Sequence, residues 1–472
     1  MIINAPLAIP MPTVSSDETE QPVIENKAQL VGYLADGCKS PELFRLGAEQ
    51  EMFVFSGEDY QPADYDGAKP GIKAMLERLV DFGWNPVFES GHSIALHRGA
   101  SSITLEPGGQ FELSGAPLKN AHQVWRETQC YHRELASVAD ELGLSFLAIG
   151  HQPKHSREQI PWMPKQRYEI MRSRMPQRGS LGLDMMQRTC SMQVNVDFSS
   201  EYDMVKKFRV ALALQPVTTA LFANSPSDMS GGNGYKSYRS KIWEDTDPDR
   251  CGSLPFVFES GMGFERYMDY ALDVPMYFVH REGRYIDATG LSFRDFLDGR
   301  LSILPGQRPL LTDWVDHLST IFPQVRLKQY LEMRGADAGD ATSRVPALTA
   351  LWAGILYDRE SLGAAWHRIS GWTLSERRSL ESGVAKHGFG TPFRNSTVQE
   401  LALWMLDLAR KGLERRNIRN HEGEDESRYL LPLQKAAETG QTFAEELVRK
   451  HSGLWRENID TALAAMCMET FS

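Results

Sequence analysis

The stretch LGAEQEMFVF at residues 46–55 alternates polar and apolar side chains, and this alternation predicts a β-strand. A period of two places Glu49 and Glu51 on one face of the strand and Gln50 on the other. Two neighbouring carboxylates repel each other unless something cationic neutralises them, so a metal or a cationic ligand is a physically reasonable partner. Exposure of both side chains to water is the competing interpretation.

A second strand is expected in SSITLEPGGQFELSG, residues 101–115, where Glu112 has a setting similar to that of Glu51. The Pro-Gly-Gly interruption indicates a turn or a bulge. It leaves Glu106 close enough in sequence to approach the same face. Function and structure are equally good explanations for Glu106.

The third expected strand, RTCSMQVNVDF at residues 188–198, has one wholly polar face that includes Gln193 and Asn195. An antiparallel strand with one wet face has this pattern, but neutral amides among carboxylates also suit oxygen ligation of a hard cation. Cys190 falls on the opposite, apolar face and is expected to be a buried thiol. Ser200 then begins a helix.

The fourth expected strand is RLKQYLEMRG, residues 326–335, in which Glu332 and Arg334 share a face. The two side chains form either a simple ion pair or a carboxylate for metal beside a guanidinium for phosphate, as phosphoryl transfer requires. The sequence contains no P-loop, zinc-protease or nucleophile-elbow motif, so a nucleotide site of another kind is expected.

Composition limits the classes of partner. The 472 residues carry a net charge of −11, which argues against broad attraction to nucleic acid or to anionic lipid and favours small molecules. The five cysteines are an odd number without a C-x-x-C pair, so neither a disulfide framework nor a zinc site is indicated. The first 24 residues lack Lys and Arg, unlike a transit peptide. A cytoplasmic location is therefore expected.

The chain is expected to have three parts: a loose tail at residues 1–24, a catalytic α+β region at residues 25–344, and a helical region at residues 345–472 packed on the same catalytic domain. Strand-like and helical patterns mix in the middle part, whereas nearly every periodic segment of the last part is helical. Capping boxes support that helical prediction. They are Thr373 with Glu376, Ser396 with Gln399, and Thr442 with Glu445.

In this order, the four segments resemble the plant and proteobacterial type of glutamate–cysteine ligase. The resemblance runs from about residue 47 to residue 356 and includes PKQRYEIM (164–171), GLDMMQRTCSMQVN (182–195), LQPVTTALFANSP (214–226), YALDVPMYF (270–278) and YLEMRGAD (330–337). It implies an α+β fold similar to glutamine synthetase. In that fold an antiparallel sheet of about six strands curls into a funnel, surrounded by helices, with a helical C-terminal part.

The resemblance also implies a site. Magnesium would be held by Glu49, Glu51, Glu112, Gln193 and Glu332, and Glu106 joins them as a candidate ligand because its place in the sequence lets it approach the same face. Arg334 and Arg239 would bind the phosphates of ATP, the co-substrate. The amino-acid substrates would contact Arg167, Met192, Tyr270 and Asn195.

The implied reaction joins the glutamate γ-carboxylate to the amine of cysteine through a γ-glutamyl phosphate, giving γ-glutamylcysteine in the first step of glutathione biosynthesis. A ligase with a different amine, a metal-dependent hydrolase and a non-catalytic binding protein remain alternatives. The expected partners are small molecules, without nucleic acid or membrane, and the expected state is a monomer or a weak homodimer. Positions that match the regulatory cysteines of plant relatives are Trp125, Ala288, Ile303 and Val345, so redox switching is not expected.

Overall fold

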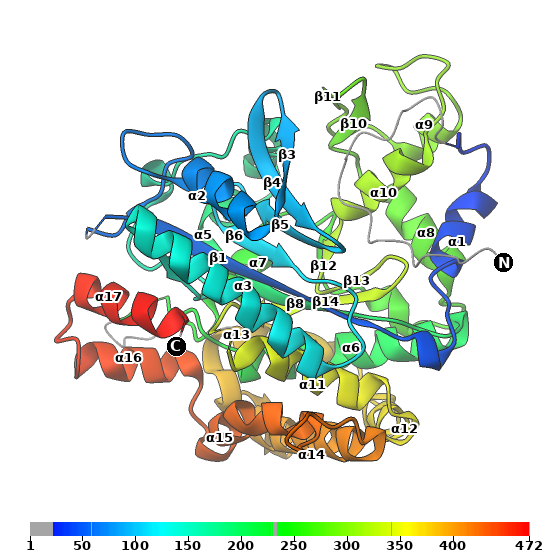
Figure 1. Ribbon diagram of the computed structural model, residues 1–472. Helices are drawn as coiled ribbons and strands as arrows, with labels where there is room; N and C mark the ends of the chain where they lie inside the picture. Colours follow the sequence, from blue (N-terminus) through cyan, green and yellow to red (C-terminus); the bar gives the residue numbers. More distant parts are fainter. Residues whose placement is uncertain (1–21, 58, 228, 230–233, 341, 472) are drawn as a thin grey trace.

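The computed structural model describes residues 22–57, 59–227, 229, 234–340 and 342–471. One ten-stranded antiparallel sheet organises the chain, with the order β13-β14-β8-β1-β6-β5-β4-β3, and with β2 and β7 also paired to β1 (Figure 1). Its strands are β1 (Leu46–Ser56), β2 (Gln61–Pro62), β3 (Asn85–Glu89), β4 (His92–Arg98), β5 (Ser101–Leu105), β6 (Phe111–Ser114), β7 (Leu144–Leu147), β8 (Ser191–Val196), β13 (Val325–Leu327) and β14 (Leu331–Asp337). The predicted antiparallel sheet is confirmed and is larger than about six strands.

The fourth expected strand is a hairpin instead. The chain leaves β13 at Leu327, turns, and returns as β14 from Leu331, so Arg326 lies directly opposite Glu332. The N–H of Lys328 donates to the carbonyl of Tyr330 at 2.8 Å, which closes the turn. Polar alternation continued through the turn, and for this reason the pattern predicted one uninterrupted strand.

Helices cover the apolar face of the sheet. Helix α11 packs under β1 and β8, α6 packs under β14, and α14 packs against α11 as the next layer (Figure 1). Burying such apolar faces against one another is the main source of stability for a layered α+β fold. The helices on this side are α3 (Ala121–Leu142), α6 (Glu201–Leu221), α11 (Arg344–Leu356), α12 (Arg359–Ile369), α13 (Leu374–His387), α14 (Val398–Arg416) and α15 (Leu431–Thr439).

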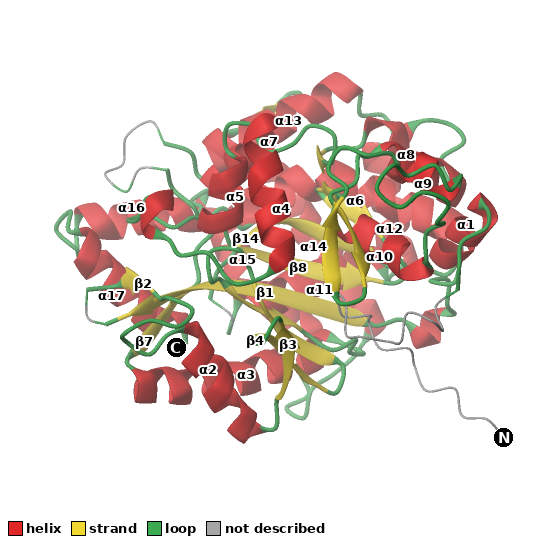
Figure 2. Cartoon of the chain, turned by 90° about the horizontal axis from the view of Figure 1, so that it is seen from above, coloured by secondary structure: helices red, strands yellow, loops and turns green. Residues whose placement is uncertain are grey.

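The opposite, polar face of the sheet is roofed by shorter helices. Seen from above, α4 and α10 lie over β1 and β8 (Figure 2). The short helices near the roof are α4 (Gln166–Arg174), α5 (Gly182–Arg188), α7 (Tyr238–Glu244) and α10 (Leu311–Ser319). The remaining elements are α1 (Lys27–Ala35), α2 (Ile72–Leu79), α8 (Phe264–Asp273), α9 (Phe293–Leu297), α16 (Phe443–Ser452), α17 (Ile459–Thr470), β9 (Cys251–Gly252), β10 (Phe278–Arg281), β11 (Arg284–Asp287), β12 (Phe322–Pro323), β15 (Pro392–Phe393) and β16 (Ser396–Thr397).

Side-chain caps set several helix starts. Ser200 accepts from the N–H of Asp203 and begins α6, as predicted. The capping boxes of Thr373 and Thr442 are both present, at the starts of α13 and α16. The box predicted at Ser396 is wrong: Ser396 pairs with Phe393 between β15 and β16, and α14 begins one residue later than that box requires.

The structure differs from the predicted N-terminal tail at Ile24. Residues 1–21 of the predicted tail lie outside the described residues. Ile24, which the tail was to include, is 1% exposed, and its N–H donates to the carbonyl of Pro309 at 2.8 Å. An apolar side chain buried in this way belongs to the folded core rather than to a loose tail.

One large hydrophobic cluster contains side chains from both sides of residue 344, including Val194 of β8 and Trp352 of α11. The helical C-terminal part therefore packs on the sheet region. The division of the chain at residues 344 and 345 stays a prediction. In the part of the chain that the structure describes, no helix combines the length and the apolar character needed to cross a bilayer.

Candidate active site

Strand register brings the polar faces of four strands together. Glu49 of β1 lies opposite Gln193 of β8, and two residues further along β1 Glu51 lies opposite Glu112 of β6. Glu332 of β14 lies opposite Asn195 of β8. These side chains were predicted to share faces of their own strands, and the register now places those faces side by side.

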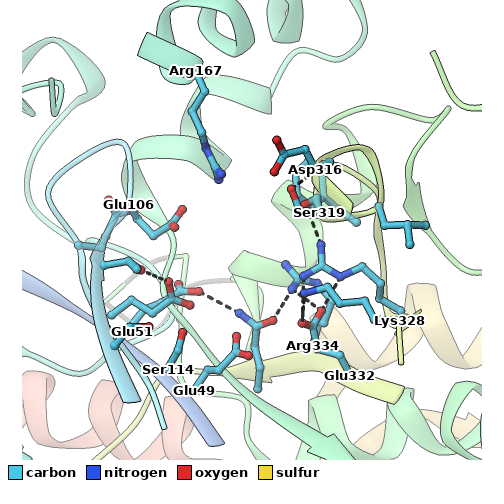
Figure 3. A pocket seen from close by; sticks show the side chains of 18 of the residues that line it. Glu49, Glu51, Glu106, Ser114, Arg167, Asp316, Ser319, Lys328, Glu332 and Arg334 are labelled. Atoms are coloured by element: carbon cyan, nitrogen blue, oxygen red, sulfur yellow. Dashed lines mark hydrogen bonds and ion pairs between the residues drawn. The ribbon is translucent and has the colours of Figure 1, made fainter. Parts of the chain in front are cut away.

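A cavity of about 380 Å³ lies on this polar face, between the strands and the helices above them (Figure 3). Its floor is made of Glu49, Glu51, Glu106, Glu112, Gln193, Glu332 and Arg334. Its walls include Lys165, Arg167 and Tyr168 beside or on α4, and Asp316 and Ser319 on α10. All six predicted metal ligands therefore line one cavity, together with two of the predicted arginines and amino-acid contacts, Arg334 and Arg167.

Glu49 and Glu51 are buried carboxyls whose ionisation is unfavourable. Burial, reinforced by Glu332 and Glu112, raises the pKa of Glu49 to about 7. Burial, reinforced by Glu112 and Glu106, raises the pKa of Glu51 to about 8. In the part of the chain that the structure describes, their direct donors are neutral groups: Asn195 donates to Glu49 at 2.9 Å, and the Oγ and N–H of Ser191 donate to Glu51 at 2.7 Å each. An added cation would remove the cost of ionising both carboxyls.

Glu112 extends this acidic group. Its side chain is 9% exposed, and its Oε2 accepts from the hydroxyl of Thr104 at 2.5 Å. Burial and the neighbouring Glu106 raise the pKa of Glu112. Burial and neighbouring carboxyls thus oppose ionisation of Glu49, Glu51 and Glu112, and a bound cation would offset that cost.

Glu332 is held in the opposite way. Arg326 donates to it through two nitrogens at 2.7 and 3.0 Å, and Lys328 and Arg334 reach it at 3.3 and 2.8 Å. Burial alone would oppose ionisation, but the charges of Arg326, Lys328 and Arg334 outweigh it and keep the pKa of Glu332 well below its usual range. Glu332 is therefore an ionised carboxylate within a cationic corner of the cavity.

Gln193 links these two regions. Its amide nitrogen donates to Glu51 at 3.3 Å, while its amide oxygen accepts from Arg334. Among the described residues, no three His, Cys, Asp or Glu side chains are grouped as a ready-made metal cage. Mg²⁺ does not need one, since it keeps several waters and is usually bound by one or two carboxylates together with substrate phosphates.

Arg239 lies behind the floor rather than in it. The guanidinium of Arg239 donates to the carbonyl of Arg334 at 2.8 Å and approaches Asp337 at 3.9 Å. It lines a second cavity, of about 300 Å³, which shares Arg334, Trp243 and Phe322 with the first. Arg239 therefore supports the segment that carries Arg334, and it does not line the larger cavity.

Two predicted substrate contacts lie elsewhere. Met192 is fully buried in the core under the sheet, because it points to the apolar face of β8. Tyr270 lies on α8 and packs against Phe256 and Tyr267, away from the larger cavity. Asn195 is joined to the site by its hydrogen bond to Glu49 and by its strand pairing with Glu332. The expectation for Met192 and Tyr270 came from the resemblance, and strand alternation alone had already placed Met192 with the core.

Several cavity residues had no predicted role. Lys165 is buried, donates to the carbonyl of Leu105 at 2.8 Å, and has a pKa lowered to about 8 by burial and by Arg167. Lys165 stands in the PKQRYEIM segment, so its neighbourhood was a usable signal. Arg326 and Lys328 were visible on the charged face of the fourth segment. Asp316 sits within a helical pattern and gave no signal at all.

Comparison with known proteins decides the family. Residues 45–465 match the model of "Glutamate-cysteine ligase family 2(GCS2)". The chloroplastic glutamate–cysteine ligase of Medicago truncatula is 50% identical over 450 residues, covering 94% of this chain and 87% of that protein. That of Arabidopsis thaliana is 49% identical over 450 residues, covering 94% and 84%.

The chain belongs to glutamate–cysteine ligase family 2. As a member of glutamate–cysteine ligase family 2, it is an enzyme, a ligase of glutamate and cysteine. The resemblance drawn from the four segments is thereby confirmed.

A solved structure supports the fold of this ligase family. The bifunctional glutathione synthetase of Pasteurella multocida matches with a TM-score of 0.51 and 12% identity over 94% of this chain. The chain spans about half of that protein, 54% of its length. At this identity the likeness concerns the fold alone, and it agrees with the predicted α+β architecture.

The relatives also correct one expectation about this ligase. The sequence predicted a cytoplasmic location, from its scattered cysteines and from an N-terminal segment without Lys or Arg. The relatives of Medicago truncatula and Arabidopsis thaliana are named chloroplastic enzymes, which contradicts that prediction. Absence of a recognisable transit composition is a weak signal, and the cytoplasmic assignment is withdrawn.

Proposed function

We propose that the 380 Å³ cavity catalyses ATP-dependent joining of the glutamate γ-carboxylate to the amine of cysteine, with magnesium held on its floor. The observation that carries the proposal is the charge distribution of the floor. Within the described residues, Glu49 and Glu51 form no ion pair with a cationic side chain, and they lie beside a cationic corner formed by Arg326, Lys328 and Arg334. A bound cation and a polyphosphate complement those two regions.

Magnesium fits the donor set. Glu49, Glu51, Glu112 and Glu106 line the cavity and offer hard oxygen ligands, and Gln193 offers a neutral amide. When bound, Mg²⁺ neutralises the terminal phosphates of ATP and orients the phosphoryl group for transfer. Glu332 is the sixth proposed ligand, and its three cationic partners would have to share it with the metal.

Arg334 is the proposed phosphate ligand of this chain. Its guanidinium lines the cavity next to Glu332 and Gln193 and carries a permanent charge. Lys328 and Arg326 add to the positive potential of the same corner. Arg239 acts in this proposal as a positioning residue, because it binds the carbonyl of Arg334 from behind.

The chemistry begins with a poor electrophile. A free carboxylate would have to expel oxide to form an amide, so the γ-carboxylate first attacks the γ-phosphorus of ATP and ADP leaves. The amine of cysteine then attacks the carbonyl carbon of the γ-glutamyl phosphate, and phosphate leaves as the amide forms. The buried floor and the roof of α4 and α10 limit water at the mixed anhydride, which would otherwise hydrolyse it.

The proposal also covers the partners, the oligomeric state and the division of the chain. The partners are small molecules rather than nucleic acid or membrane, in keeping with the net charge of −11. The protein acts as a monomer or a weak homodimer. Residues 25–344 form the catalytic region, with residues 345–472 packed on it as helical support.

The decisive experiment supplies ATP, magnesium and glutamate with a panel of amino acids, and follows ADP release together with product mass. We expect ADP release only when an amino acid is present to supply the attacking amine. We expect γ-glutamylcysteine to be the preferred product. If another amine is the preferred substrate, the protein is a γ-glutamyl ligase of different specificity. Magnesium-dependent hydrolysis without ATP consumption would support a hydrolase and sink the ligase.

A further inference from the structure

Asp316 is a buried carboxylate without a hydrogen-bond partner at one oxygen. It lies on α10, its residue is 9% exposed, and among the described residues nothing donates to its Oδ2. It lines the larger cavity. Burial raises the pKa of Asp316 to about 7, with Asp313 adding to the rise and Arg167 opposing it. An unpartnered buried carboxyl is costly, so an outside donor is expected to complete it.

Arg167 is its counterpart on the other wall. It lies on α4, its guanidinium rests 5.5 Å from the ring centre of Tyr168, and its Nε is buried without a hydrogen-bond acceptor in the described residues. Figure 3 shows Arg167 reaching into the cavity from above and Asp316 on the adjoining wall, with the cavity between them. Each residue belongs to a different helix of the roof.

The two groups attract each other electrostatically, yet no ion pair joins them in the part of the chain that the structure describes. A gap between an unpaired cation and an unpaired anion fits a ligand that bears both charges on neighbouring atoms. An α-amino acid is such a ligand. We propose that Arg167 binds the α-carboxylate of glutamate and that Asp316 binds its α-ammonium group, an assignment that rests on the proposed function.

Of the three substrates, glutamate suits Arg167 and Asp316 better than cysteine or ATP does. The amine of cysteine must lose its proton before it attacks, whereas a buried carboxylate holds an amine in its charged form. The α-amine of glutamate takes no part in bond formation, so it stays charged throughout. ATP carries no ammonium group, and its phosphates would be repelled by Asp316. The γ-carboxylate of glutamate is then free to point toward the floor.

Two analogues separate the roles of the pair. Glutarate is glutamate without the α-amine, and 4-aminobutyrate is glutamate without the α-carboxylate. We expect the wild-type protein to prefer glutamate over each by about 100-fold or more in kcat/KM, because a site built for a charged group rejects a ligand that lacks it. The reaction is followed by ADP release with cysteine and saturating ATP and magnesium.

The variants should then fail in a crossed pattern. Asp316→Asn should lower kcat/KM for glutamate about 100-fold while leaving glutarate within about threefold, so that preference for the amine collapses. Arg167→Gln should lower kcat/KM for glutamate about 100-fold while leaving 4-aminobutyrate within about threefold. The preference for glutamate over glutarate should stay intact in this variant. The KM for cysteine should change by less than about threefold in both variants. Thr312→Ala, on α10 but away from the cavity, is the matched control and should leave both preferences unchanged.

Equal losses for glutamate and glutarate in Asp316→Asn would overturn the assignment, as would a loss confined to cysteine. Should that variant not fold, Asp316→Glu keeps the charge and must retain preference over glutarate. Isothermal titration of glutamate and glutarate without ATP tests the pair independently of catalysis. If the wild-type protein binds glutamate selectively but never releases ADP, the proposed function is refuted. The assignment of Arg167 and Asp316 as glutamate ligands would still hold.

Discussion

Glu51 of β1 and Glu112 of β6 are direct partners in the antiparallel register, so two carboxyls of adjacent strands face the same cavity. Like charges placed opposite each other in a sheet are destabilising. Their environment therefore favours protonation or a bound cation, which is the physical basis of the proposed magnesium site.

Replacing Glu51 with Gln should separate stability from function. At about pH 9, where Glu51 is ionised, Glu51→Gln removes one of the two like charges, so the metal-free protein should gain up to about 1 kcal/mol in unfolding free energy. Turnover should fall at least about 100-fold, since a metal ligand contributes several kcal/mol to transition-state stabilisation. Thermal unfolding and ADP release measure the two effects. Glu265→Gln, an exposed position on α8, should alter neither. Unchanged magnesium dependence in Glu51→Gln would refute the metal assignment.

Magnesium binding should release protons near neutral pH. The pKa values of Glu49 and Glu51 are raised to about 7 and about 8, so both carboxyls are partly protonated at pH 7 and must ionise to bind a cation. Titration calorimetry at pH 7 in buffers of different ionisation enthalpy should give different apparent heats. At pH 9 that difference should vanish. Buffer-independent heats at pH 7 would contradict the raised pKa values.

The same shifts give the metal-free protein a pH dependence of stability. Each folded-state pKa lies above the unfolded value, near 4.5, so the folded state binds more protons between about pH 4.5 and 8. The contribution of Glu49 and Glu51 is therefore fully present below pH 4.5 and is lost as pH rises through 8. Saturating magnesium should reduce this loss. Comparing thermal midpoints of wild type and Glu51→Gln from pH 6 to 8 isolates the effect.

Arg326 should matter more for stability than any exposed arginine. It makes two hydrogen bonds to buried Glu332 and others to the carbonyls of Ser319 and Ile321. Arg326→Met removes positive charge that offsets the burial of ionised Glu332. A loss of about 3–5 kcal/mol in the free energy of unfolding is expected, measured by urea unfolding. Arg410→Met, which breaks exposed pairs on α14, should cost less than about 1 kcal/mol. Similar losses in the two variants would contradict the buried network.

The C-terminal helices depend on a close crossing. A Cβ at Gly412 of α14 would lie 1.9 Å from the carbonyl oxygen of Gly354 on α11. Gly412→Ala should therefore cost about 1–3 kcal/mol through overpacking. Gly363→Ala on α12 meets nothing within 4 Å and should stabilise its helix by up to about 1 kcal/mol. Thermal melts of both variants provide the test, and a neutral Gly412→Ala would show that the crossing adjusts.

Local alternation of polar and apolar residues was enough to predict which side chains share a strand face. Alternation placed Glu49 with Glu51, Gln193 with Asn195, and Cys190 in the core, and the structure agrees at each position. Side-chain direction along a strand is a local property of the backbone, so it needs no knowledge of distant residues. The ordered set of segments likewise sufficed for the family.

The partners of those strand faces depend on how distant segments pack in the folded chain. Register made Glu51 and Glu112 partners, a turn at residues 328–330 brought Arg326 onto Glu332, and packing of α4 and α10 set Arg167 and Asp316 around one cavity. Packing of α8 keeps Tyr270 away from that cavity, whereas strand alternation alone already places Met192 in the core. Pairing, burial and pKa arise from groups far apart in sequence, and their energies exist only once the chain has folded. For that reason the acidic floor and Arg334 were predictable, whereas the pairing of Arg326 with Glu332 was not.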